Sequence, residues 1–272
     1  MLRETGSTLA SDPIVEFFDR RAAEYDREYN DQTAGGYALR IRRKKVLDLF
    51  DQPGGNVLDV GCGPAVMTQD MLDRGCRFWG VDPSAQMIEI CRRRFQESER
   101  VHFLRGDAQR LQLPDNFFDA VLCMGVIDSL TDRPLAVREM LRVLKPAGTL
   151  IITFTNICSP YAWWKNFMFY PVVRAWHEWR ARKGDPTLNP SRRRSGKTRV
   201  LYSRRAACEF LRAEGTEVVQ VVGYYYNVVF SPLDELLRST GLWLTQKLEE
   251  GRWRTPEWIA VGMIIKARKG SS

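Results

Sequence analysis

The chain has 272 residues, of which 44% are hydrophobic and 27% are charged, a composition typical of a soluble globular protein with one full core. Its net charge of +8 predicts attraction to something anionic, such as nucleic acid, a membrane surface or a phosphorylated substrate. Six cysteines without a CxxC pair, together with only two histidines, argue against a zinc site and against a disulfide framework, so no metal site is expected.

In chain order, the first stretch, MLRETGSTLASDP, lacks the apolar segment of a signal peptide, and no run approaches the roughly 20 apolar residues of a membrane span. We therefore expect a cytoplasmic protein, or one that lies peripherally at a membrane. A helix is expected to begin at Asp12, which precedes a proline at the first helical position. A second helix is expected after a break at Gly35 and Gly36.

After residue 55, short β-rich runs alternate with helical segments, a pattern typical of parallel βαβ units. Strands are expected near 56–60, 77–81, 101–104, 118–123 and 148–154, with helices near 64–74, 84–96 and 132–144. Residues 156–205 break this alternation and predict an insertion. The pattern then returns with a helix at 203–215, a strand in EVVQVVGYYY, a helix near 232–249 and a last strand in WIAVGMIIKAR.

Two glycines follow the first expected strand, in NVLDVGCGPA, and mark a turn where a ligand can approach the backbone closely. A dinucleotide-binding loop would carry a third glycine where this chain has Val66, so the loop is poorly suited to two phosphates. Asp59, Asp82 and Asp107 end three successive strands, at the sheet edge where ligands bind. Each alone is most often a cap or turn residue. Together they favour a nucleoside site, with Asp82 accepting the ribose hydroxyls and Asp107 the adenine amino group.

Four stretches in order, VLDVGCGPA, GVDPSAQMI, GDAQRLQLPDNFFDAVLC and EMLRVLKPAGTLIITF, resemble class I S-adenosylmethionine-dependent methyltransferases of the small-molecule type. The resemblance covers residues 12–154 well and the last two strands loosely. It implies a doubly wound, mostly parallel seven-stranded α/β sheet of the Rossmann-like methyltransferase fold. The implied organisation is N-terminal helices and a cofactor-binding half over 1–155, an aromatic and basic substrate cap over 156–205, and the rest of the same α/β domain over 206–272.

The resemblance also implies where the cofactor, S-adenosylmethionine, would bind. The glycine loop would face its methionine part, and the first helix would close over it with Tyr25. Residues after the fourth strand would line the floor beside the sulfonium. The implied cofactor-binding residues are Tyr25, Asp59, Gly61, Cys62, Gly63, Asp82, Pro83, Met87, Asp107, Ala108, Cys123 and Met124.

Methyl transfer from a sulfonium is an in-line displacement that gains much of its rate from positioning, so a dedicated base is optional. The candidate catalytic residues are Asp128 and His177, with a tyrosine of 224–226 as a further choice. Each also has a structural interpretation: Asp128 as a helix cap, and His177 as a packed or surface histidine. Cys62 and Cys123 are expected to fill space, since nothing beside them lowers a thiol pKa.

The sequence favours an enzyme that methylates a small hydrophobic or amphipathic acceptor, preferably on oxygen, such as a lipid-like molecule or a natural product. Residues 161–179 carry eight aromatic side chains, and eleven Lys or Arg against two acids lie between Arg174 and Arg205. Such a segment could bind an anionic membrane surface, although a small cap core with a solvated basic face explains it as well. An RNA methyltransferase using the basic insertion is a second hypothesis, disfavoured because no RNA-binding module is appended. A non-catalytic membrane or partner adaptor is the third. The oligomeric state is left open.

Overall fold

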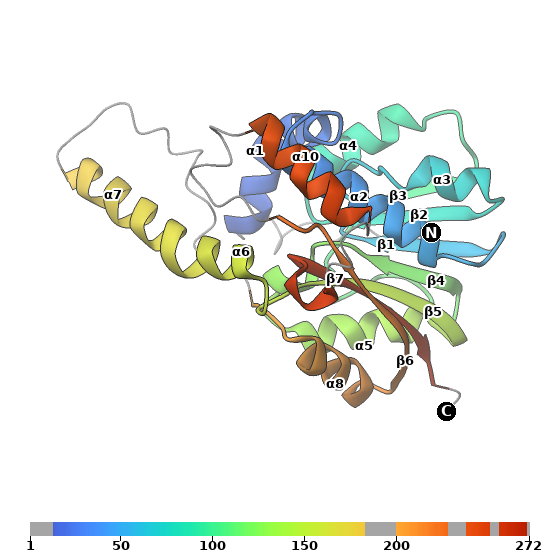
Figure 1. Cartoon of the computed structure of the whole chain (residues 1–272). Coiled ribbons are helices and arrows are strands. Elements are labelled where there is room, and N and C mark those ends of the chain that lie inside the picture. The colour runs from blue at the N-terminus through green and yellow to red at the C-terminus, as the bar shows by residue number, and fades with distance from the viewer. Residues whose placement is uncertain (1–12, 183–199, 228–237, 251–255, 271–272) are drawn as a thin grey trace.

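The centre of the molecule is a seven-stranded sheet with the strand order β3-β2-β1-β4-β5-β7-β6 (Figure 1). The computed structural model describes residues 13–182, 200–227, 238–250 and 256–270. The strands are β1 (Asn56–Val60), β2 (Arg77–Asp82), β3 (Val101–Arg105), β4 (Phe118–Cys123), β5 (Leu144–Thr155), β6 (Thr216–Tyr224) and β7 (Gly262–Lys269). All neighbouring pairs are parallel except the two that β7 makes, with β5 and with β6. The expected doubly wound, mostly parallel sheet is confirmed.

Helices cover both faces of the sheet (Figure 1). The α2 (Ala34–Leu49), α3 (Thr68–Asp73) and α4 (Ala85–Arg94) helices pack on one face, and α5 (Arg133–Val143) and α8 (Arg204–Ala213) pack on the other. Helix α1 (Pro13–Glu28) contacts α4, and α10 (Arg238–Glu249) contacts α2. Successive strand residues point to opposite faces. Val57 therefore packs in the core beneath α2, α3 and α4, and Leu58 packs in the core beneath α5 and α8. This arrangement leaves the carboxyl ends of β1, β2 and β4 together at one sheet edge.

The sequence predicted a break at Gly35 and Gly36 before the second helix, but both glycines are part of α2. Gly35 and Gly36 lie in the first turn of α2, where the backbone N–H of Gly36 donates to Thr33 Oγ1 at 3.0 Å. A Cβ on Gly36 would lie 2.3 Å from the carbonyl oxygen of Asp31 and 2.5 Å from that of Glu28. Glycine is needed because the end of α1 presses against the start of α2.

The other expected elements exist with shifted ends. Helix α3 begins only at Thr68, because the turn after β1 uses the preceding residues. Strand β5 begins at Leu144, directly after α5. The last strand starts at Gly262, after the short 3₁₀ turn η5 (Glu257–Ile259). Of the helix expected near 232–249, residues 238–249 form α10, and residues 228–237 lie outside the described ranges.

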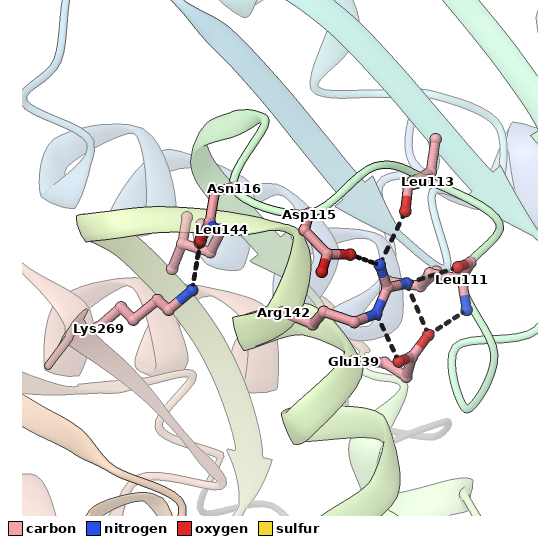
Figure 2. A network of polar contacts seen from close by, with 8 residues as sticks. All are labelled: Leu111, Leu113, Asp115, Asn116, Glu139, Arg142, Leu144 and Lys269. Carbon is pink, nitrogen blue, oxygen red and sulfur yellow. Dashed lines mark hydrogen bonds and ion pairs between the residues drawn. The ribbon is translucent and has the colours of Figure 1, made fainter. Parts of the chain in front are cut away.

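A polar network fixes the connection between β3 and β4, which begins near Asp107 (Figure 2). The guanidinium of Arg142, at the end of α5, donates to the carbonyl oxygens of Leu111 at 2.7 Å and Leu113 at 2.9 Å. It also binds the carboxylates of Glu139 and Asp115. The connection is thereby tied to a helix on the far face of the sheet.

The same figure shows Lys269 tying the end of β7 to the turn before β4. Its ammonium group donates to the carbonyl oxygen of Leu144 at 2.7 Å and to Asn116 Oδ1 at 2.8 Å.

The aromatic segment forms an elongated helical unit between β5 and α8. It consists of α6 (Pro160–Trp163), a π-helical turn η3 (Trp164–Phe169) and α7 (Tyr170–Arg182). Figure 1 shows α7 projecting from the side of the sheet, with α6 at its root. The division of the chain at 156 and 205 stays a prediction. Among the helices in the described ranges, none has the length and apolar character needed to cross a bilayer.

Candidate functional site

The loop after β1 is held tightly against β2. The N–H groups of Gly61 and Cys62 both donate to the carbonyl oxygen of Val81, at 2.7 and 3.1 Å. Gly61 has φ +72°, and a Cβ there would lie 2.2 Å from Cγ2 of Val126, so no other residue fits without rearrangement. The loop therefore presents bare backbone at the sheet edge.

Asp82, the last residue of β2, organises this loop. Its carboxylate accepts N–H groups from Gly63 and from Ser84, both at 2.9 Å. The pKa of Asp82 is raised to about 6, chiefly by burial and with a smaller contribution from the carboxylate of Asp19, against the lowering effect of these two N–H donors. Each carboxylate oxygen can still accept a second hydrogen bond, for example from a hydroxyl group.

Asp59, on β1, is a carboxylate in an apolar environment. It is fully buried, and within the described part of the chain neither of its oxygens has a hydrogen-bond partner. Burial raises its pKa to about 7; the guanidinium of Arg42 opposes this rise, and the carboxylate of Asp82 adds to it. A buried carboxylate without donors costs free energy unless a cation or a hydrogen-bond donor meets it. Asp59 is thus suited to a positively charged ligand group.

Arg42 is a site residue that sequence reasoning missed. It is buried on α2, donates from Nη2 to the hydroxyl of Tyr29 at 3.1 Å, and lies against Gly125, where a Cβ would be 2.5 Å from Nη1. Gly125 follows β4 and has φ +74°. The arginine stands in the run RIRRKK, which suggests a solvated face. The available signal was its position four residues before the buried Val46, on the same side of the helix.

Helix α1 places Tyr25 beside the loop, and the expected role of Tyr25 in covering the cofactor stays a prediction. A Cβ on Gly63 would lie 3.8 Å from the ring of Tyr25. The helix is held in place by a hydrogen bond from Ser84 Oγ to Asp19 and by an ion pair of 2.8 Å between Asp26 and Arg94.

The residues expected around the nucleoside lie beyond β2 and β3. One oxygen of Asp107 accepts the N–H of Gln109 at 2.9 Å, so this carboxylate also stabilises its own turn. Ala108 is buried beside it. On the β2 side, Pro83 accepts a hydrogen bond from Arg105, and Met87 is buried in α4.

The cysteines near the site are packing residues. The sulfur of Cys62 packs against Gly80, where a Cβ would be 2.8 Å from it, and Cys62 belongs to the core beneath α2, α3 and α4. A side-chain hydrogen bond with Cys91 and burial raise the pKa of Cys62, and burial raises that of Cys123. Raised pKa values keep both thiols protonated, so neither is suited to act as a nucleophile. Met124 is buried in the same core.

The two candidate bases occupy different settings. Asp128 lies in the 3₁₀ turn η2 (Ile127–Ser129) after β4, and its Oδ2 accepts both the N–H of Thr155, at 2.9 Å, and its hydroxyl. This bond ties the loop after β4 to the end of β5. His177 belongs to α7, and its side chain lies outside the described part of the structure. Tyr225 and Tyr226, the two residues directly after β6, are both buried.

Comparison with known proteins identifies the family. Residues 58–152 match a family model described as a methyltransferase domain. The demethylmenaquinone methyltransferase of Renibacterium salmoninarum is 34% identical over 141 residues, which cover 52% of this chain and 58% of that protein. The demethylmenaquinone methyltransferase of Listeria welshimeri is 30% identical over 164 residues, which cover 58% of this chain and 68% of that protein. The match thus spans about three fifths of the length of the first of these relatives.

Solved structures agree at the level of the fold. A putative methyltransferase of Haloferax volcanii, in complex with the Trm112 activator, aligns with a TM-score of 0.62 at 20% identity over 93% of this chain and 97% of that one. Magnesium protoporphyrin IX methyltransferase of Synechocystis, with bound S-adenosylhomocysteine, aligns with a TM-score of 0.59 at 13% identity over 94% and 98%. With a sheet of this order, a bare loop beside two buried carboxylates, and these relatives, the chain belongs to the S-adenosylmethionine-dependent methyltransferase family.

Proposed function

We propose that this protein transfers a methyl group from S-adenosylmethionine to a small hydrophobic or amphipathic acceptor. The observation that carries the proposal is the pair of buried carboxylates, Asp59 and Asp82, at the ends of adjacent strands beside the bare backbone of Gly61 and Gly63. The relatives named as methyltransferases support it.

The donor set suits this cofactor. Neither carboxylate oxygen of Asp59 accepts a hydrogen bond within the described residues. The ammonium group of the methionine part would supply both N–H donors and a positive charge. The guanidinium of Arg42 suits the carboxylate of the same part. Asp82 has acceptor capacity left for ribose hydroxyls, and Asp107 with Ala108 is proposed for adenine. When bound, the cofactor supplies an electrophilic methyl group on a cationic sulfur.

The contribution of the chain is to position the reactants and to exclude water. Cys123, the last residue of β4, and Met124 after it are both buried, and Tyr25 lies beside the loop from α1. Asp128 is proposed to orient the loop after β4 through Thr155, because its Oδ2 is engaged there. His177 is retained as a candidate base on α7.

The acceptor atom is a finer question. Oxygen is the atom favoured by the sequence. The relative from Vibrio cholerae, 31% identical over 149 residues, is named a ubiquinone/menaquinone biosynthesis C-methyltransferase, which favours carbon as the second candidate. Incubation with phenolic and quinol acceptors and a ¹³C-labelled methyl donor separates the two, since the carbon shift of an O-methyl group differs from that of a C-methyl group.

Calorimetry with S-adenosylmethionine and S-adenosylhomocysteine tests the cofactor site. Asp82→Asn should weaken binding about ten- to hundred-fold, because it removes a charged acceptor of about 1.5–3 kcal/mol. Asp119→Asn is the matched control: this strand carboxylate binds the N–H of Asn56 at the opposite end of β1 and should not affect the affinity. If the wild-type protein binds neither compound, or if Asp82→Asn binds as tightly as wild type, the proposal fails.

A further inference from the structure

The α6–η3–α7 unit exposes an unusual number of large apolar side chains. Trp163 and Phe167 each expose 51% of their surface, Val172 exposes 66% and Trp179 exposes 53%; Met168 and Trp176 are exposed as well. We define these six residues as the apolar stripe. Within the described part of the chain, more than half of the exposed large apolar residues belong to it.

The π-helical turn decides how the stripe is arranged. In a continuous α-helix with about 100° per residue, Trp163 and Val172 would lie about 180° apart, on opposite sides. The six residues of η3 are wound with i→i+5 bonding. At about 4.4 residues per turn they remove about 110° of rotation, which brings Val172 to about 70° from Trp163. By the same estimate all six stripe residues fall within an arc of about 145°, so they share one face.

The root of the unit is attached to the body. Tyr161 is buried and packs with Ile41 of α2 and with Tyr225, directly after β6. The ammonium group of Lys165 donates to the Tyr161 hydroxyl at 3.1 Å and lies over the ring of Tyr170. By the same rotation estimate, Tyr161 and Lys165 lie outside the arc of the stripe.

The charge of the same region complements an anionic surface. Between Arg174 and Arg205 the sequence carries eleven basic and two acidic residues, an excess of nine in a chain whose net charge is +8. The guanidinium of Arg180 lies 4.7 Å from the centre of the Trp176 ring, which places a cation beside the stripe. Tryptophan rings at headgroup depth with basic residues alongside are the features by which an amphipathic helix binds anionic lipid.

We propose that the apolar stripe docks the protein on an anionic lipid bilayer, so that an amphipathic acceptor reaches the site from the membrane. The inference rests on the proposed function only for the acceptor. The root of the unit supports this route, because Tyr161 packs in the cluster that includes Tyr224, which lies close to Arg42. The membrane is thus brought near the loop after β4.

Co-flotation of the full chain with vesicles of phosphatidylglycerol and phosphatidylcholine, without acceptor or cofactor, tests the docking alone. The wild-type protein should float with these vesicles, and the bound fraction should fall about tenfold on pure phosphatidylcholine. The Trp176→Ala/Trp179→Ala variant should lose a similar factor, whereas Trp243→Ala, which removes an exposed ring from α10, should float as wild type does.

An insertion variant tests the geometry. Adding one alanine after Asn166 retains every aromatic residue and adds about 80–100° of rotation before α7, so it should reduce flotation by turning the distal rings away from Trp163. Cofactor affinity, measured by calorimetry on the same proteins, should be unchanged, which separates a failure of docking from a failure of the proposed function.

Three outcomes would overturn the docking proposal. The first is flotation that is unaffected by both the tryptophan variant and the insertion. The second is an equal loss of flotation in Trp243→Ala. The third is a wild-type protein that does not bind vesicles and instead binds RNA, or that self-associates through the same tryptophans, as measured by light scattering.

Discussion

Replacing Asp59 by asparagine should stabilise the protein while weakening its hold on the cofactor. The fully buried carboxylate has a pKa raised from 3.8 to about 7, chiefly by burial. The folded protein holds this proton more tightly than the unfolded chain does. The contribution of Asp59 to the free energy of unfolding is therefore complete below about pH 4 and is lost as the pH rises through 7. Three pKa units correspond to about 4 kcal/mol. Asparagine has the same shape and does not titrate, so the variant avoids this loss.

The assay is urea unfolding of both proteins from pH 4.5 to pH 8, without cofactor. The free energy of unfolding of Asp59→Asn, minus that of the wild type, should grow with pH by up to about 4 kcal/mol and level off above pH 7. Titratable groups common to both proteins cancel in this difference. At pH 8 the variant should also bind S-adenosylmethionine at least about tenfold more weakly, since it lacks the anion for the ammonium group.

Asp119→Asn supplies a control with the opposite sign. Burial would raise the pKa of Asp119, but the N–H of Asn56 and the ammonium group of Lys145 outweigh it and lower the pKa below 3.8. Its stabilising contribution is complete above about pH 4, so this variant should be less stable than wild type by a nearly constant amount from pH 5 to pH 8. Parallel stability curves for Asp59→Asn and wild type would refute the reasoning about Asp59.

The other predictions concern the loop after β4. Gly125→Ala should destabilise the protein by at least about 1–3 kcal/mol and weaken cofactor binding, because the φ of +74° and the 2.5 Å approach to Arg42 leave no room for a methyl group; equal melting temperatures of variant and wild type would contradict this. Asp128→Asn and Thr155→Val should each lower the melting temperature and kcat without changing the pH profile of kcat, because both break one positioning contact. A shift of the profile in Asp128→Asn alone would instead identify Asp128 as the base.

Much of the fold could be predicted because its signals are local. The strand runs, and the helices between them, carry their periodicity in the sequence, and β1 and β4 were placed with their observed bounds. One error arose at the tight connection between α1 and α2. Gly36 looked like a breaker because the close approach of the Asp31 carbonyl is invisible in the sequence.

The site was predictable to the same extent. Aspartates at strand ends are conspicuous in a linear sequence, whereas the burial of Arg42 depends on Gly125, more than eighty residues away, having no side chain. The π turn was missed for a similar reason: its sequence, WKNFMF, fits an α-helix equally well, and only the register of the residues on both sides reveals it.

The placement of β7 bears on how the chain is made. This strand leaves the ribosome after the other six strands of the sheet, yet it is inserted between β5 and β6, and within the described residues β6 pairs with no other strand. During translation β6 has no neighbouring strand until β7 has been made, and its backbone N–H and C=O groups can then pair with other chains. The sheet is complete only when residues 262–269 pair with both β5 and β6. A nascent protein halted before this point would be prone to aggregation.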